Sequence, residues 1–219
     1  MTNCIDYSDR VEIRNVDIMG ETNWHWIKGD EGGFGHAGDG PMRDWIEGHS
    51  KKYFQYLKKQ DVIITGGSSC GMHIRFYAKQ FKHVIAFEPD PLSFYCMCLN
   101  APYENVVKLN AALGRGHGMI GIVRNPKNVG SNIVTQPNEH YIPMMAIDSL
   151  NVHDCDLLQL DVEGYEMHVL EGAKNTIAKF KPVVICERFS NLDQQKFMDD
   201  LGYEMKDSSF MDTIYVPRS

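Results

Sequence analysis

Short apolar runs alternate with longer amphipathic segments through the middle of the chain. The runs over 61–65 and 83–87 are typical of buried strands, and each leads through a turn into a helical pattern, over 72–81 and 91–100. Asp90 stands where a helix N-cap is expected, just before the second helical pattern. Because strand, turn, helix, strand and helix in this order are typical of parallel sheets with crossover helices, we predict an α/β fold.

The same alternation continues towards the C-terminus. Apolar residues recur every three or four positions between Glu163 and Phe180, which predicts one amphipathic helix over that range. A last helix is expected over 192–201, where Gly202 fits a C-cap glycine, and the tail over 203–217 could supply two closing strands. The remaining strand-like runs are 105–109, 119–123, 156–160 and 181–186.

Residues 1–60 differ in composition from the rest of the chain. Six glycines fall between positions 29 and 40, after the Trp24-His25-Trp26 run and before a predicted helix over 43–59. Such glycine density is typical of loops. Two interpretations stay open, a lid that closes over a ligand and a surface connection without a role. We therefore divide the chain into an N-terminal extension over 1–60 and a main domain over 61–219.

Composition favours a folded, globular protein and disfavours a nucleic acid partner. Hydrophobic residues make up 43% of the 219 residues and charged residues 23%, close to the averages of globular domains. The 29 acidic residues outnumber the 22 basic ones, and the net charge of −7 disfavours a nucleic acid partner. With no bilayer-spanning apolar run and no signal-peptide pattern, we expect a soluble, cytoplasmic protein without a membrane partner. The six cysteines form no C-x-x-C pair and are expected to be free thiols.

A glycine-rich turn from Thr65 to Gly71 follows the first strand of the predicted sheet. In doubly wound folds, glycines at this turn let a cofactor approach the main chain. The turn is not a P-loop, because Met72 stands where that motif needs a lysine. Glu88 ends the second strand, where a carboxylate can accept hydrogen bonds from both ribose hydroxyls of an adenosine. The two features fit either a nicotinamide dinucleotide or S-adenosylmethionine.

Three carboxylates follow the strand-like run over 156–160, at Asp161, Glu163 and Glu166. They fall at the carboxyl edge of the predicted sheet, where open α/β folds bind their ligands. A helix start recruits an acid for its dipole, which explains Glu163 or Glu166 better than it explains Asp161. No tyrosine in the chain has a lysine four residues later, as a short-chain dehydrogenase would need. The acidic residues after this strand and the lack of a dehydrogenase motif favour S-adenosylmethionine over a nicotinamide dinucleotide.

From about Val62 to Arg188 the chain resembles the FkbM family of S-adenosylmethionine-dependent methyltransferases. The most specific match is Leu160–Gly172, and the other motifs follow in the family's order. The resemblance implies a Rossmann-like class I methyltransferase fold, a doubly wound, mostly parallel seven-stranded sheet with a C-terminal antiparallel strand. It makes 61–219 the catalytic domain. The other matching motifs are Val84–Asp90, Leu109–Gly114, Ala146–Leu150 and Pro182–Glu187.

The resemblance also implies roles for individual residues. Glu88 would hold the ribose of S-adenosylmethionine, and the acceptor would be a hydroxyl of a sugar or a natural-product-like small molecule. A hydroxyl has to lose its proton, so a nearby base would help the reaction. The candidate catalytic residues are Asp161, Glu163 and His168, with His140 behind them. The implied cofactor-binding residues are Thr65, Gly66, Gly67, Ser69, Gly71, Glu88, Asn110, Ala111 and Asp161.

Three positions depart from the family's pattern. The family normally has an acid where this chain has Thr65, an asparagine where it has Ser69, and often a lysine where it has Gln159. These departures keep open a second hypothesis, a methyltransferase-like module that binds the cofactor without chemistry. A third hypothesis, an NAD-dependent oxidoreductase, rests on the glycine turn and Glu88 alone.

Two further features carry weaker predictions. Asp161 and Glu163 could bind magnesium through their carboxylates, but the resemblance does not require a metal and we expect none. Trp24, Trp26 and Phe34 could form a wall for the acceptor, since aromatic faces suit sugars and rings, or they could form a small satellite core.

Overall fold

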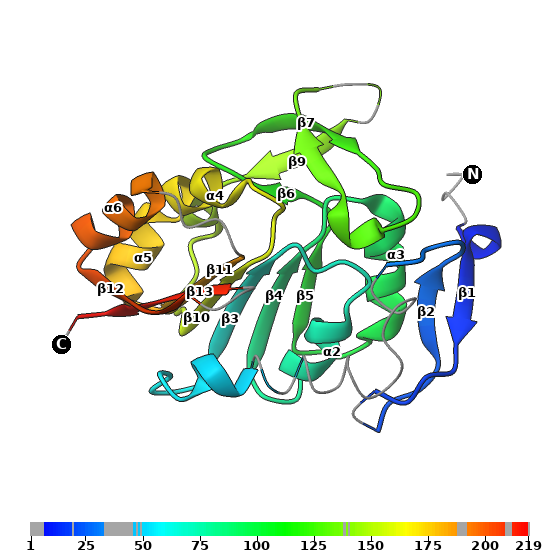
Figure 1. Ribbon diagram of the computed structural model, residues 1–219, viewed down its shortest axis with the longest axis horizontal. Helices are drawn as coiled ribbons and strands as arrows, with labels where there is room; N and C mark the ends of the chain where they lie inside the picture. Colours follow the sequence, from blue (N-terminus) through cyan, green and yellow to red (C-terminus); the bar gives the residue numbers. More distant parts are fainter. Residues whose placement is uncertain are drawn as a thin grey trace.

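A seven-stranded sheet forms the centre of the protein in the computed structural model (Figure 1). The structure describes residues 7–18, 20–32, 46, 48, 50–137, 139, 141–187, 192–208 and 212–218. The strand order is β12-β13-β11-β10-β3-β4-β5, and only the pairings of β13 with β11 and β12 are antiparallel. This arrangement confirms the expected sheet. The strands are β3 (Val62–Gly66), β4 (His83–Phe87), β5 (Val106–Leu109), β10 (Leu157–Leu160), β11 (Val183–Glu187), β12 (Tyr203–Ser208) and β13 (Asp212–Pro217).

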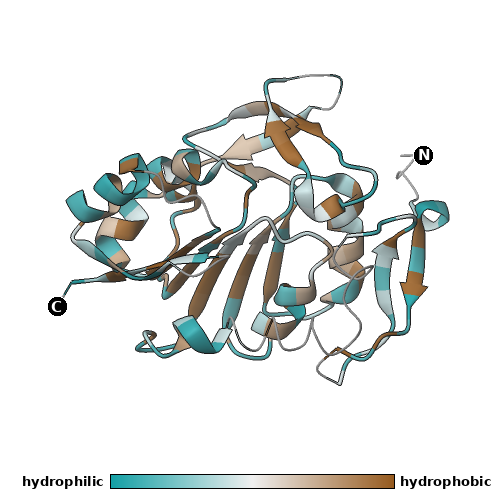
Figure 2. Ribbon diagram, viewed as in Figure 1, coloured by the Kyte–Doolittle hydropathy of each residue, from teal (hydrophilic) through white to brown (hydrophobic). Residues whose placement is uncertain are grey.

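Helices cover both faces of the sheet. Successive residues of β3 pack into hydrophobic cores on opposite faces of the sheet. Ile64 packs with the side chains of α4 to α6, whereas Ile63 packs with those of α2 and α3. Fully buried parallel strands have to be apolar on both faces, which is why they read as continuous apolar runs (Figure 2). The helices are α2 (Met72–Tyr77), α3 (Pro91–Asn100), α4 (Glu166–Gly172), α5 (Lys174–Phe180) and α6 (Leu192–Asp200).

The single helix predicted from Glu163 to Phe180 is wrong in two respects. It begins only at Glu166, because Glu163 and Gly164 adopt positive φ angles of 52° and 90°. It also divides at Ala173, where the Asp148 carboxylate accepts hydrogen bonds from the first N–H groups of α5 and so starts a new helix. The helix expected over 72–81 is shorter as well and ends at Tyr77.

A second, four-stranded sheet lies beyond the carboxyl edge of the central one, with the order β6-β9-β7-β8 (Figure 1). The sequence pattern predicted only one of its strands, over 119–123. The pieces are short, and their pairing joins positions up to about thirty residues apart. The strands are β6 (Ala112–Leu113), β7 (Gly118–Val123), β8 (Ile133–Thr135) and β9 (Ile142–Met145).

The N-terminal residues form an antiparallel hairpin of β1 (Val11–Arg14) and β2 (Trp24–Ile27). Trp24 and Trp26 are each only 2% exposed and belong to a small core with Leu92 and Cys96 of α3, as the satellite-core interpretation expects. The glycine-rich loop from 33 to 45, including Phe34, lies outside the described residues, so the lid remains a prediction. Of the helix expected over 43–59, the described residues 46, 48 and 50–54 are helical, and it ends at 54.

Among the described residues, no helix combines the length and the apolar character needed to cross a bilayer.

Candidate cofactor and catalytic site

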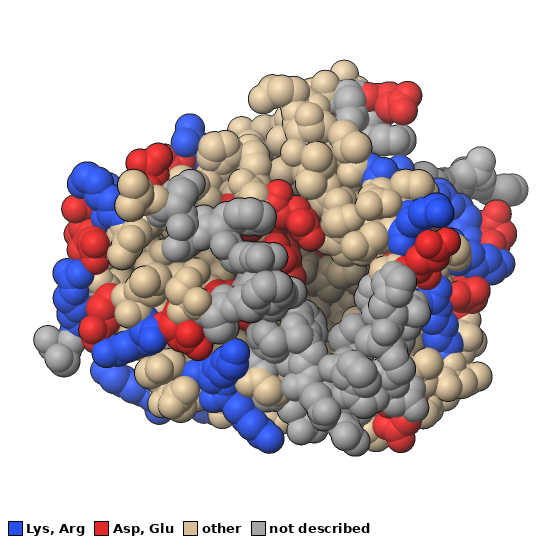
Figure 3. All heavy atoms as spheres, in the orientation of Figure 1, with Lys and Arg blue, Asp and Glu red and all other residues tan. Residues whose placement is uncertain are grey.

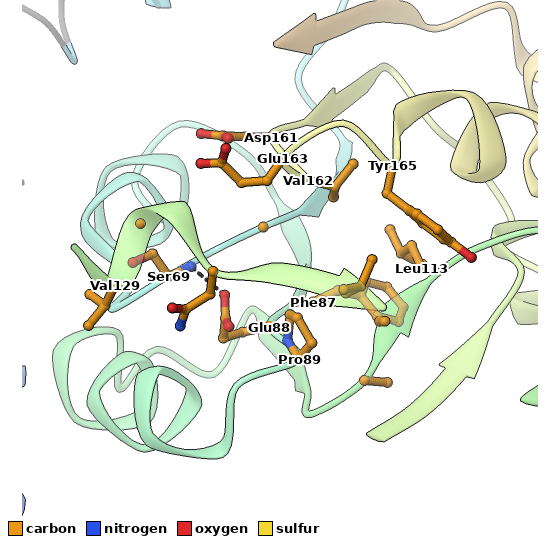
Figure 4. A pocket seen from close by; sticks show the side chains of 16 residues that line it. Ser69, Phe87, Glu88, Pro89, Leu113, Val129, Asp161, Val162, Glu163 and Tyr165 are labelled. Atoms are coloured by element: carbon orange, nitrogen blue, oxygen red, sulfur yellow. Dashed lines mark hydrogen bonds between the residues drawn. The ribbon is translucent and has the colours of Figure 1, made fainter. Parts of the chain in front are cut away.

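A cleft opens at the carboxyl edge of the central sheet, between that edge and the small sheet (Figures 3 and 4). Its empty volume is about 640 Å³, part of which is open to solvent. Its walls come from the loops after β3, β4 and β10 and from the segment before β8. The lining residues are Gly67, Ser69, Phe87, Glu88, Pro89, Ala111, Ala112, Leu113, Val129, Gly130, Asn132, Val134, Asp161, Val162, Glu163 and Tyr165.

The loop after β3 forms the floor of the cleft and runs close to the loop after β10. Gly67 has a φ of 78°, and a Cβ there would overlap the carbonyl oxygen of Asp161. Gly71, the N-cap of α2, has a φ of 87° and lies against Met97. Only glycine meets both demands, so the glycines of this turn bring two loop backbones together and leave the main chain open to a ligand.

Glu88 connects the loops after β3 and β4. It is buried, and its two carboxylate oxygens accept hydrogen bonds from the Ser69 N–H at 2.7 Å and the Asp90 N–H at 2.8 Å (Figure 4). Burial raises the pKa of Glu88 to about 8, although the two N–H donors lower it in part. Each oxygen keeps a second lone pair for another donor.

The backbone that carries Glu88 is held by a side chain from the next strand. Asn110 donates hydrogen bonds through Nδ2 to the carbonyl oxygens of Glu88 and Pro89, at 2.8 and 3.0 Å. Asn110 is not among the described residues that line the cleft, so its direct role is to hold the wall in place.

Three carboxylates meet on the opposite side of the cleft. Oxygens of Asp161, Glu163 and Glu187 all lie within 4.8 Å of one another, close enough to share a cation or a proton. Loss of hydration and the charge and hydrogen bonding of Glu187 raise the pKa of Asp161 well above its usual range. Loss of hydration and the charge of Glu187 also raise the pKa of Glu163 to about 7. Like charges held this close cannot all ionise freely, so the cluster retains protons near neutral pH.

Glu187 is the member of this cluster that the sequence did not single out. It ends β11, just as Glu88 ends β4 and Asp161 follows β10. Adjacent parallel strands bring their carboxyl ends together. The sequence signal that could have identified Glu187 as a site residue was therefore its position at the end of an apolar run.

The structure brings six of the predicted site residues to one cleft, and these are Gly67, Ser69, Glu88, Ala111, Asp161 and Glu163. Four other predicted residues do not line the cleft but lie behind its lining and support it: Thr65, Gly66, Gly71 and Asn110. His168 does not line the cleft. Its ring lies edge-on to the Tyr165 ring, with 4.3 Å between the ring centroids, and its side chain is 40% exposed. His140 lies outside the described residues.

Two of the departures from the family's pattern form a pair. Thr65 and Gln159 are register partners on β3 and β10, and the Thr65 hydroxyl donates a hydrogen bond to Gln159 Oε1 at 2.7 Å. Where the family's acid and lysine would face each other as ions, this chain has a neutral hydrogen bond. Thr65 is buried, so a lone carboxylate at this position would carry a desolvation cost.

This pairing predicts a non-additive effect in a double-mutant cycle. Thr65→Asp and Gln159→Lys should each lower the free energy of unfolding, because each buries a charge beside a neutral partner. The double variant should recover about 1–2 kcal/mol of the summed loss. Urea denaturation of the four proteins measures the coupling, and simple additivity would contradict the pairing.

The strand order, with one antiparallel strand beside β11 and a cleft at the carboxyl edge, defines the class I methyltransferase fold. A family model described as the methyltransferase FkbM domain matches residues 69–207, and the chain belongs to this family.

Two relatives give the scale of the similarity. Hexuronic acid methyltransferase AglP of Haloferax volcanii is 27% identical over 135 residues, which are 58% of this chain and 56% of that protein. The crystal structure of a methyltransferase FkbM from Methylobacillus flagellatus KT has a TM-score of 0.53 and 14% identity, over 76% of this chain and 50% of that one. The structural match concerns the fold alone. The chain spans about half the length of these two relatives.

Proposed function

We propose that the protein is an S-adenosylmethionine-dependent methyltransferase that acts on a hydroxyl group of a sugar or a natural-product-like small molecule. The observation that carries this proposal is the cleft that Glu88 and Asp161 share, one at the end of β4 and the other just after β10. One carboxylate is thereby available for a ribose and the other for an acceptor. Membership of the FkbM methyltransferase family supports the same chemistry.

The residues of the cleft fit S-adenosylmethionine better than a nicotinamide dinucleotide. Gly67 lets the loop after β3 lie against the Asp161 carbonyl with its main chain at the cleft, and Glu88 has lone pairs for ribose hydroxyls. No described residue that lines the cleft is basic, and three acids meet at one side, so a pyrophosphate would be repelled whereas a sulfonium would be favoured. In this assignment the turn through Gly67 and Ser69 holds the methionine part, and Ala111 borders the adenine.

The acidic cluster supplies the base for the reaction. When bound, S-adenosylmethionine provides the methyl carbon that the acceptor oxygen attacks. Asp161 accepts the hydroxyl proton, and burial beside Glu187 and Glu163 raises its pKa well above the usual range, which makes it a stronger base. Without such a base the attacking oxygen would keep its proton and be a poor nucleophile.

The acceptor would be a small hydroxylated molecule. Tyr165 contributes an aromatic ring to the cleft wall on the side of Val162 and Leu113 (Figure 4), and an aromatic face suits a sugar ring. The curated relative is named for a hexuronic acid, which supports a sugar acceptor here. The net charge of −7 argues against a nucleic acid acceptor.

Calorimetric titration with S-adenosylmethionine, S-adenosylhomocysteine and NAD in parallel tests the cofactor. We expect both adenosyl ligands to bind and NAD to give no heat. Binding of NAD alone would overturn the proposal in favour of the oxidoreductase.

Turnover separates the enzyme from an inactive binding module. Release of S-adenosylhomocysteine is followed while hydroxylated sugars are screened, with and without EDTA. We expect turnover that EDTA leaves unchanged. Cofactor binding without turnover on any acceptor would favour the inactive module, and loss of turnover in EDTA would assign a cation to the acidic cluster.

A further inference from the structure

One wall of the cleft is a segment that we call the roof, residues 124–132, between β7 and β8. It contains a short 3-10 helix, η2 (Val129–Ser131), and contributes Val129, Gly130 and Asn132 to the cleft beside Glu88. Outside that short helix the roof has no regular structure, and β8 itself has only three residues. Its position therefore depends on contacts with other parts of the chain.

The first anchor of the roof is Asp90, which is 1% exposed and also caps α3. Its carboxylate accepts two hydrogen bonds from the guanidinium of Arg124, at 2.7 and 3.1 Å, and one from Asn132 Nδ2 at 3.0 Å. Asp90 thus holds both ends of the roof. A two-point contact of this kind fixes orientation as well as distance.

The second anchor comes from the N-terminal extension and holds the middle of the roof. The Asp30 carboxylate, 4% exposed, accepts hydrogen bonds from the Val129 N–H at 3.0 Å and the Trp26 Nε1–H at 2.7 Å. Beside it, the N–H groups of Glu31 and Gly32 donate to the Lys127 carbonyl oxygen at 2.8 and 2.9 Å. The roof is thereby joined to residues nearly one hundred positions earlier.

Asp30 is itself held in place from behind. The Trp26 ring that donates to it is buried in the core of the hairpin and α3. Arg14 donates a hydrogen bond to the Asp30 carbonyl oxygen at 2.9 Å, and its guanidinium lies over the Trp26 ring. Asp30 therefore has a fixed position relative to α3, which begins three residues after Glu88.

We propose that Asp30 is a positioning residue of the cofactor site, and that the segment 24–32 completes this site although it precedes the residues that the family model matches. The inference rests on the proposed function. Asp30 acts through Val129: it keeps the roof closed against Glu88, so that the ligand does not have to order the roof when it binds. If the roof is closed only a fraction of the time, the dissociation constant rises by the inverse of that fraction.

The test compares Asp30→Asn with Trp26→Phe and with a matched control in the same N-terminal segment, Asp9→Asn. Asparagine keeps the shape of Asp30 but turns one oxygen into a donor, which then faces an N–H group. We expect Asp30→Asn to weaken S-adenosylmethionine and S-adenosylhomocysteine binding about tenfold, and Trp26→Phe to weaken it less. Asp9 is exposed and lies outside the roof, so Asp9→Asn should bind both ligands as the wild type does.

Hydrogen exchange separates positioning from a general loss of stability. In folded Asp30→Asn we expect faster exchange of the amides in 124–134 and unchanged exchange in β3 and β4. Wild-type affinity in this folded variant, or faster exchange spread over the whole domain, would overturn the inference. If Asp30→Asn did not fold, Trp26→Phe would decide by the same two measurements. If the wild-type protein bound neither ligand, the proposed function would fail, and exchange in the roof would still show whether Asp30 holds it.

Discussion

Asp161→Asn is expected to lower kcat for methyl transfer by about 10²–10⁴-fold, the range found when a positioned general base is removed. Asparagine has nearly the same shape but cannot take up the acceptor's proton. The side chain's cofactor contacts change little, so affinity for S-adenosylmethionine should stay within a few fold of the wild type. The measurement is the release of S-adenosylhomocysteine at saturating cofactor, with a hydroxylated acceptor found by the screen described above.

The pH dependence of the same reaction gives a second readout. A base has to be deprotonated before it can act, and burial and Glu187 raise the pKa of Asp161 above its usual range. The pKa of Glu163, raised to about 7, belongs to the same cluster. Wild-type kcat should therefore rise with pH through neutrality, and the rise should be lost in Asp161→Asn.

The control for this variant is Glu171→Gln, which removes one negative charge from α4 where Glu171 pairs with Arg115 outside the cleft. Its kcat and pH profile should match those of the wild type. An Asp161→Asn enzyme that kept kcat within a few fold would assign the base to another residue.

Glu88→Ala is expected to weaken S-adenosylmethionine binding about 100-fold. The change removes the acceptor for the ribose hydroxyls and leaves the N–H groups of Ser69 and Asp90 without their partner. Glu88→Gln should have a smaller effect, because one oxygen remains as an acceptor. Calorimetric titration measures both variants, and an unchanged affinity would show that the ribose is held elsewhere.

The raised pKa of Glu88 also predicts how stability and affinity depend on pH. The folded, ligand-free protein keeps a proton on Glu88 up to about pH 8, whereas the unfolded chain loses it near 4.5. The stabilisation from this proton is complete below pH 4.5 and is lost as pH rises to 8. The free energy of unfolding should therefore fall over this interval, less steeply in Glu88→Gln. Because the ribose needs the charged carboxylate, affinity should rise with pH until Glu88 is ionised.

The central sheet and α3 could be predicted from the sequence because their signals are local. Strands buried on both faces have to be apolar at every position, and Asp90 and Pro91 define the start of α3 by their own chemistry. The break at Ala173 could not be predicted, since the carboxylate that caps α5 comes from Asp148, more than twenty residues earlier. Three strands of the small sheet were missed for a related reason: β6, β8 and β9 have only two to four residues and are stabilised by their partners rather than by their own pattern.

The same distinction between local and long-range signals applies to the residues of the candidate site. The sequence by itself determined the glycine turn, Glu88 and Asp161, because each follows a strand-like run and the ends of parallel strands meet at one edge. Only the tertiary structure brought Glu187 into the acidic cluster, paired Thr65 with Gln159, and joined Asp30 to the roof of the cleft. These contacts join positions 24 to 99 residues apart. No local preference of the chain encodes such distances, which arise when the hydrophobic faces of the helices and the sheet pack together.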